Sequence, residues 1–320
     1  MRLILVLMVF VMSMFMPAAS FALDLFAEFG IETRYINGDS TFHISFDNPW
    51  AYGGHSESEL EFPLNGFWGG LHLVVGNRHD QNPKQTTGRL SLSLLQSIGS
   101  GWGEMKDSDW IENDAAFGES PHDGKDLYTE SDASLNGTML DISYGHHFPI
   151  NSRWSIGPMV GFRYHRLEYD IDGYRGIYWD TPVSGTGRVI EYEIKYKIPY
   201  VGIGAEALLG SKGQFQISCS LAYSDWVDAT DVDHHLLRGL RFEGDCEGEA
   251  FLIRFNADWN FRTDWVLTMG AEYVDIDTSG YQLQSFESGY IIGYVNDTIT
   301  SSYWSAILGI SYTWFATPTS

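Results

Sequence analysis

Two short acidic segments hold the residue types with the clearest capacity for chemistry. The segment DATDVDHHLLRGLRF (residues 228–242) sets Asp231 and Asp233 beside the pair His234–His235, and EMKDSDWIEND (104–114) contains Asp107 and Asp109. In an extended chain, residues two apart share a face, so Asp233 can orient His235 as a general base. The same residues could also form a solvated acidic loop or a metal site. Structural zinc prefers closely spaced Cys and His ligands, however, and the two cysteines lie elsewhere in the chain. The choice depends on the elements that position these residues.

The N-terminus predicts export from the cytoplasm. Arg2 precedes an apolar run of about 14 residues, too short to cross a bilayer comfortably, and Pro17 and AASFA follow. This layout predicts a signal peptide over residues 1–22 with Ser20–Phe21–Ala22 at the cleavage site; a core helix is the alternative. We expect the mature chain, 23–320, to form one domain.

The rest of the chain alternates apolar and small or polar residues over long stretches. The segments RWSIGPMVGFRYHR (153–166) and SYWSAILGISYTW (302–314) are examples, and aromatic residues make up 15% of the chain. A soluble sandwich would also alternate. The length of these stretches, with aromatic residues at both ends of the apolar face, favours strands that face lipid outside and a polar interior inside.

Ten such stretches predict an all-β fold, a ten-stranded antiparallel transmembrane β-barrel with long extracellular loops. Short and long connections alternate along the chain, as in outer-membrane barrels. Both acidic segments then fall in long loops at the same end, one in 100–133 and the other in 227–247. The remaining long connections are 38–57, 172–189 and 283–297. The predicted strands are 24–37, 58–77, 86–99, 134–149, 153–171, 190–209, 213–226, 248–261, 264–282 and 298–315.

At this point the chain resembles a known family. YKIPYVGIG followed by AYSDWVDATDVDHHLLRGLRF, together with KDSDW, is similar to the motifs of the omptins, ten-stranded outer-membrane endopeptidases. The resemblance implies that Asp107 and Asp109 form a catalytic pair and that Asp233 and His235 form a dyad that activates water. It also places Asp231 in a pocket for a basic substrate side chain. It implies no metal and no cofactor apart from lipopolysaccharide as an activating lipid.

The charge balance bears on the substrate. With 19 basic and 42 acidic residues the net charge is −23, which attracts cationic peptides and proteins and gives no reason to expect a nucleic-acid partner. The family's second acidic pocket residue, in the first loop, has no clear counterpart, because Phe42 or Ser45 aligns there and Asp47 is only near. Dibasic against single-basic specificity therefore stays open. Ser58 and Ser131 are not expected to be nucleophiles.

Two basic residues are candidates for contact with lipopolysaccharide. Arg166 lies on the outward face of its strand just above the aromatic residues, and a lipid phosphate suits it. Lys195 stands where the family has a second arginine, but strict alternation would turn it inward. Binding of Arg166 to water or to headgroups in general remains an alternative.

The cysteines are expected to stay apart. Cys219 shares its parity with outward Leu221, whereas Cys246 shares its parity with inward Arg254, and cross-strand neighbours must share a face. A β-bulge would leave room for a disulfide.

We therefore expect a monomer in the outer membrane with its site facing the cell exterior. The alternative from another class is a non-enzymatic barrel that acts as an adhesin or binding protein through the same acidic loops. Convergence of the four candidate side chains on one water would favour the enzyme.

Overall fold

The computed structural model describes residues 25–48, 54–79, 82–111, 125–179, 181–210, 214–262 and 264–315. The predicted signal peptide lies outside these residues. Within them, no helix is both long enough and apolar enough to cross a membrane.

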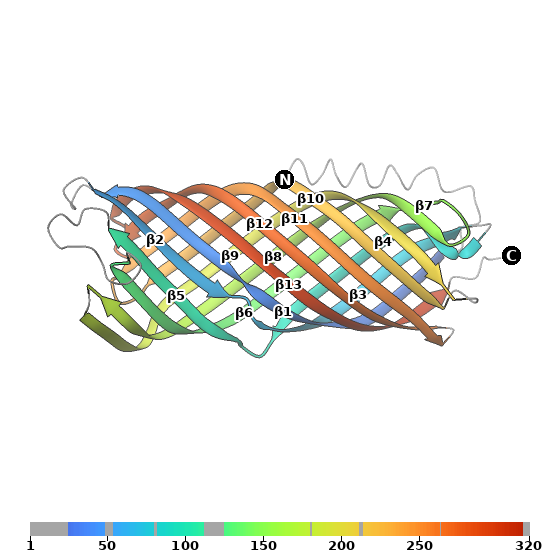
Figure 1. The fold of residues 1–320 in the computed structure, drawn as a ribbon, viewed down its shortest axis with the longest axis horizontal. Helices are drawn as coiled ribbons and strands as arrows, with labels where there is room; N and C mark the ends of the chain where they lie inside the picture. Colours follow the sequence, from blue (N-terminus) through green and yellow to red (C-terminus); the bar gives the residue numbers. More distant parts are fainter. Residues whose placement is uncertain are drawn as a thin grey trace.

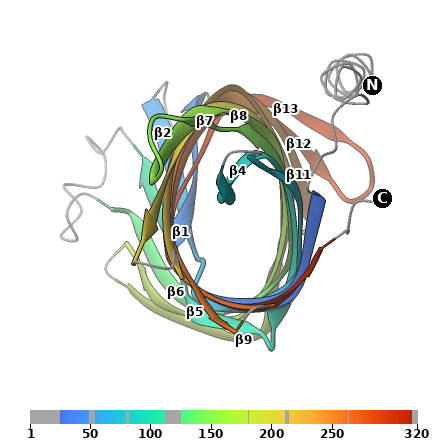
Figure 2. The ribbon, with the colours of Figure 1, turned by 90° about the vertical axis from the view of Figure 1, so that its right-hand side faces the viewer.

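The described chain is a single antiparallel sheet that closes on itself (Figures 1 and 2). The first strand pairs with the last, from Phe26 opposite Phe315 to Ser45 opposite Asn296. Within the described residues, closure leaves no unpaired edge in the half that faces lipid, as a sheet in lipid requires. The strands are β1 (Leu25–Asn48), β2 (Gly54–Pro63), β3 (Gly66–His79), β4 (Asn82–Ile98), β5 (Gly101–Ile111), β6 (Leu127–His146), β7 (Phe148–Pro149), β8 (Trp154–Tyr178), β9 (Thr181–Leu209), β10 (Phe215–His235), β11 (Leu240–Arg262), β12 (Trp265–Phe286) and β13 (Ile291–Phe315).

These segments occupy about ten positions around the ring, which confirms the predicted barrel. Strands β2 and β3 both pair with β1 and form one interrupted strand, and β4 and β5 both pair with β6 and form another. The two interruptions lie side by side, since the amide of Trp102 donates to the carbonyl of Asn65. Gly99 makes the bend between β4 and β5 with φ 73°, a conformation that favours glycine.

The predicted loop lengths were wrong. Residues 227–235 and 240–247 are paired strand, with only residues 236–239 forming the turn between β10 and β11. Likewise β1 continues to Asn48 through residues expected to be loop. The polar side chains of these segments suggested loops. Strand pairing satisfies their backbone amides and carbonyls, and the paired strands extend the barrel beyond the membrane.

The outer surface marks the membrane-spanning half. Aliphatic side chains such as Ile203 and Leu308 are about half exposed there, at 54% and 52%. Aromatic residues bound this band on both sides, which confirms the predicted girdles. One girdle includes Phe67, Trp102, Tyr273 and Trp304. The other, at the terminal end of the barrel, where β1 begins and β13 ends, includes Trp154, Phe215, Trp259 and Trp314.

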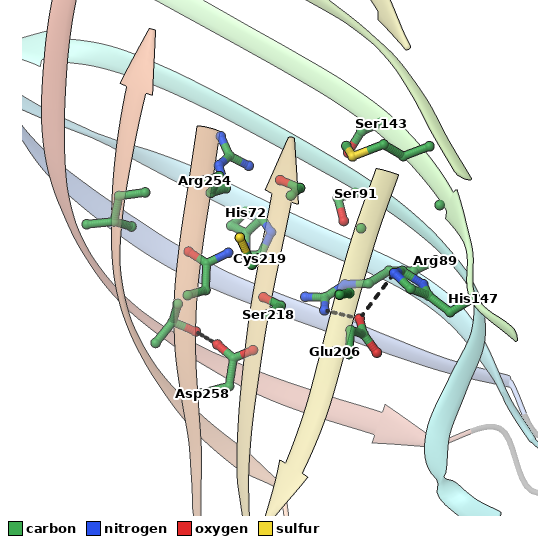
Figure 3. A pocket seen from close by; sticks show the side chains of 18 of the residues that line it. His72, Arg89, Ser91, Ser143, His147, Glu206, Ser218, Cys219, Arg254 and Asp258 are labelled. Atoms are coloured by element: carbon green, nitrogen blue, oxygen red, sulfur yellow. Dashed lines mark hydrogen bonds and ion pairs between the residues drawn. The ribbon is translucent and has the colours of Figure 1, made fainter. Parts of the chain in front are cut away.

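Inside the membrane-spanning half, the lumen is charged. Arg163 donates to Asp141 at 2.8 Å and to Glu272 at 2.7 Å, and Arg34 reaches Glu272 at 2.9 Å. Arg254 donates to the same Glu272 at 2.7 Å. Nearer the terminal end lies a cavity of about 120 Å³, where Glu206 stands between Arg89 and His147 (Figure 3).

The charged lumen confirms the polar interior predicted inside the lipid-facing band, whereas above the membrane the interior is apolar. Tyr192 stacks on Phe62 with ring centroids 4.3 Å apart, and Phe42 packs edge-on against the same tyrosine. In β9 the apolar residues from Tyr192 to Tyr200 face this interior instead of lipid. This apolar core fills the barrel below its outer end. The side chains of the two acidic segments lie directly above it.

Candidate active site

A β-bulge decides which side chains of β10 face inward. Between Ser224 and Val227 the strand contains one residue more than its partner β11 spans, so the alternation shifts phase there. Below the bulge the even-numbered residues Ala222 and Ser224 are buried, and above it the odd-numbered ones are. The Ser224 hydroxyl fixes the irregularity, donating to the Pro199 carbonyl at 2.6 Å and accepting from the amide of Trp226 at 3.2 Å.

The phase shift turns Asp231, Asp233 and His235 to the inside. Nε2 of His235 lies 2.8 Å from Oδ2 of Asp233, and the two residues are 8% and 1% exposed. Ring packing of His235 against Phe242, with centroids 4.9 Å apart, fixes the imidazole further. The predicted pairing of Asp233 with His235 is therefore present, on a strand instead of a loop.

Asp107 and Asp109 lie on β5, across from Leu60 and Ser58 of β2. Burial and repulsion from Asp109 raise the pKa of Asp107 above its usual range. Burial also raises the pKa of Asp109, although a hydrogen bond from Ser58 and the charges of Arg238 and His235 oppose this rise. Two close carboxyls with raised pKa values favour a state in which one keeps its proton.

Both pairs line one cavity. A space of about 240 Å³ is bounded by Asp107 and Asp109 from β5 and by Asp233 and His235 from β10. A second space of about 300 Å³ shares Asp107 and His235 with the first. The candidate residues thus converge on one groove, with room on either side for an extended chain.

Arg238 also lies in this groove, and sequence reasoning missed it. Gly239, with φ 59°, closes the β10–β11 turn, so that the Arg238 guanidinium folds back onto Nδ1 of His235. Because a guanidinium only donates, Nδ1 is the acceptor and Nε2 carries the proton shared with Asp233. Turn residues Arg238–Gly239, three and four positions after His235, were the available clue.

Asp231 lies two residues below Asp233 on the same face and is 2% exposed. Burial, followed by the nearby charges of Asp297 and Asp233, raises the pKa of its carboxyl well above the usual range. Asp231 therefore lies below Asp233 and His235, a position compatible with the predicted pocket for a basic side chain.

Arg166 and Lys195 stand together on the outer face, where β8 and β9 pair them directly. The expectation that Lys195 turns inward was wrong, because Tyr196 and Ile194, its neighbours on either side, are the inward residues of β9. Arg166 donates to Glu193 at 2.6 Å and to Glu168 at 2.8 Å, and Lys195 contacts Glu193.

The other singled-out residues lie apart from the groove. His234 contacts Arg241 at 2.6 Å on the opposite face of β10. The two cysteines are free: Cys219 is exposed below the bulge, and Cys246 is buried above it. His147 is buried and lines the lumen cavity beside Glu206. Among the described residues, no group of three or more His, Cys, Asp or Glu side chains could hold a metal ion.

The closed barrel with its lipid-facing band defines an outer-membrane protein. Residues 80–314 match the family described as the Omptin family, and the chain belongs to that family. The crystal structure of the outer membrane protease OmpT from Escherichia coli has a similar fold, with a TM-score of 0.73, 16% identity and coverage of 90% of this chain and 97% of that one.

Two curated relatives match shorter stretches. The plasminogen activator of Yersinia pestis is 26% identical over 163 residues, 48% of each chain. The outer membrane protease OmpP of Escherichia coli (strain K12) is 27% identical over 170 residues, 50% of each chain. The chain thus spans about half the length of these relatives.

Proposed function

We propose that this omptin-family chain is an outer-membrane endopeptidase that cleaves peptides and proteins beside basic residues at the cell surface. The observation that supports this function is the convergence of Asp107 and Asp109 with Asp233 and His235 on one cavity. The relatives named as proteases support the same class of reaction.

In the proposed mechanism His235 is the general base. Its Nδ1 takes a proton from water as the water oxygen bonds to the peptide carbonyl carbon, and Asp233 stabilises the imidazolium through Nε2. The same proton then passes to the departing amine as the carbon–nitrogen bond breaks. Arg238 occupies Nδ1 and must swing aside before water can bind there.

The aspartate pair faces this base across the groove. The ionised member of Asp107 and Asp109 positions the water, and the protonated member donates a hydrogen bond to the carbonyl oxygen as negative charge develops on it. Burial of the pair keeps that proton in place near neutral pH. No covalent intermediate with the protein is required.

Lipopolysaccharide is the proposed activating lipid, and Arg166 with Lys195 is its proposed contact. Both cations face outward above the lipid-facing band, where a lipid phosphate can reach them. Glu168 and Glu193 already pair with them, so the phosphate must compete with two carboxylates. Because all strands close within one chain, we propose that the enzyme is a monomer.

The test is cleavage of a fluorogenic Arg-Arg peptide by the refolded barrel in lipopolysaccharide. Asp233→Ala and His235→Ala are expected to lower kcat/KM by roughly a thousandfold, since each removes the base or its orienting partner. His234→Ala is the matched control, because that side chain lies on the opposite face of β10 and should leave the rate unchanged.

The competing function is a binding barrel. A wild-type protein that cleaves neither this peptide nor peptides with one or no basic residue would reject the peptidase and favour an adhesin acting through the acidic groove.

A further inference from the structure

A second buried carboxylate lies beside Asp231. Asp297, near the start of β13, is 1% exposed and pairs in the sheet with Ile44 of β1 and Gly280 of β12. A Cβ atom added to Gly244 of β11 would lie 1.9 Å from Oδ1 of Asp231 and 2.7 Å from Oδ2 of Asp297. The two carboxylates therefore approach one point, and only glycine at position 244 leaves that point free.

The donors around these carboxylates are neutral. Three of their four oxygens, both of Asp231 and Oδ1 of Asp297, are buried without a well-formed hydrogen bond. The Gly244 amide lies near Asp231, and the Thr298 amide and the Cys246 thiol, at 3.6 Å from Oδ2, are the donors at Asp297. Among the described residues, no arginine, lysine or histidine forms an ion pair with either. Two uncompensated buried carboxylates are unfavourable, so this place is built for a cation that arrives from outside.

The pair is connected to the active-site groove. Gln282, which lines the groove cavity, stands opposite Gly244 in the sheet, and its own amide Nε2 is buried without a partner. Tyr192 lies near Asp231, Asp297 and Asp233, whose negative charges help burial to raise the pKa of its hydroxyl. That hydroxyl is also buried without a hydrogen-bond partner. A side chain that leaves the groove beside Gln282 would thus meet polar groups down to the carboxylates.

We propose that Asp297 is the second acidic residue of the substrate pocket and that, with Asp231, it binds the guanidinium or ammonium group of the substrate residue beside the cleaved bond. This inference rests on the proposed peptidase function. Among the described residues of β1, Phe42 and Ile44 are buried here, and β13, which pairs with β1, supplies the acid from the adjoining strand. Two carboxylates at one point suit a forked guanidinium especially well.

The experiment compares two peptides that differ only in arginine or its neutral isostere citrulline before the cleaved bond. We expect Asp297→Asn and Asp231→Asn each to lower the arginine-to-citrulline ratio of kcat/KM by at least about tenfold, mainly through the arginine peptide. Asp297→Glu should keep the preference for arginine. Asp277→Asn, on the exposed outer face of β12, removes the same charge and should leave the ratio unchanged. Circular dichroism and heat-dependent gel mobility verify that each barrel is folded.

Failure of the pocket and failure of the peptidase give different results. A folded Asp297→Asn barrel that cleaves with an unchanged ratio would overturn the role of Asp297 and leave the peptidase intact. If the wild type cleaves neither peptide, the peptidase fails, and fluorescence anisotropy with the His235→Ala barrel tests the pocket alone. Tighter binding of the arginine peptide, lost on adding Asp297→Asn, supports the pocket; equal binding of both peptides overturns it.

Discussion

The two halves of the barrel interior treat buried acids in opposite ways. In the membrane-spanning half, Glu32, Asp141 and Glu272 each contact at least one arginine. In the extracellular half, only one cation, Arg238, lies among the described acids of the groove and pocket. Those acids are Asp107, Asp109, Asp231, Asp233 and Asp297.

This difference separates structure from function. Charges that are paired inside the fold hold strands together and have no capacity left for a ligand. Charges that are buried without partners destabilise the fold, and they persist where a ligand or a reaction supplies the missing charge. The paired charges of the lumen therefore stabilise the barrel, and the unpaired acids mark the extracellular groove as the place for the proposed substrate.

The largest expected effect is on the paired half. Glu272→Gln leaves Arg34, Arg163 and Arg254 facing one another without their shared carboxylate, and we expect it to destabilise the barrel by about 3–5 kcal/mol. Urea unfolding in detergent, followed by tryptophan fluorescence, measures the loss. Glu247→Gln, exposed on the outer face of β11, is the control. Equal stability of the two variants would mean that the lumen network is not structural.

The next effect is on Asp107 and Asp109, the aspartate pair of the groove. Asp107→Asn removes one member of the pair and is expected to lower kcat/KM by about a hundredfold with little change in stability, because the lost interaction forms only during the reaction. Asp132→Asn, exposed on the neighbouring strand β6, controls for charge. A large loss of stability with unchanged kcat/KM would reverse the assignment.

A third prediction is a gain in stability. Burial raises the pKa of Asp297 to about 7 from an ordinary value of 3.8, so ionising it in the fold is unfavourable and stability falls as pH rises across that range. Asp297→Asn should therefore stabilise the barrel at pH 8, by at least about 1 kcal/mol, and give no gain at pH 4.

Melting temperatures at the two pH values measure this gain. Asp245→Asn, exposed on the outer face of β11, should show no such dependence. A gain of equal size at both pH values would show that the effect does not arise from ionisation.

The smallest effect concerns Arg238, the guanidinium that lies in the groove. Arg238→Ala frees Nδ1 of His235, and we expect a rise of a few-fold in kcat/KM for short peptides, corresponding to about 1 kcal/mol. Arg241→Ala, whose side chain contacts Glu243 and His234 on the outer face, is the control. A fall in activity would instead show that Arg238 helps to bind the substrate.

Much of this arrangement could be predicted from the sequence. Alternation with flanking aromatic residues gave the strand number, because lipid on one side imposes a period of two. The Asp107–Asp109 and Asp233–His235 spacings gave the facing pairs, because residues two apart share a face.

What failed depended on pairing between distant strands. Polar residues at 228–235 look like loop until β9 and β11 are seen to satisfy their backbone. The inward face of β9 above the membrane follows from what packs inside, so neither Tyr192 nor Lys195 could be oriented from its neighbours alone. Asp297 is distant from Asp231 in the chain, and only the sheet register brings the two together.

The β-bulge between Ser224 and Val227 determines which side chains of the hairpin above it face the interior of the barrel. If one residue were deleted there, the segment DATDVDHH would present Val232 and His234 to the groove, and Asp231, Asp233 and His235 would point outward. If this hairpin were grafted onto another barrel, the graft would therefore have to include the extra residue of the bulge, so that the same side chains face inward. Residues 231–235 supply the acidic and imidazole side chains of this hairpin, but the bulge several residues earlier determines which side of the barrel wall they face.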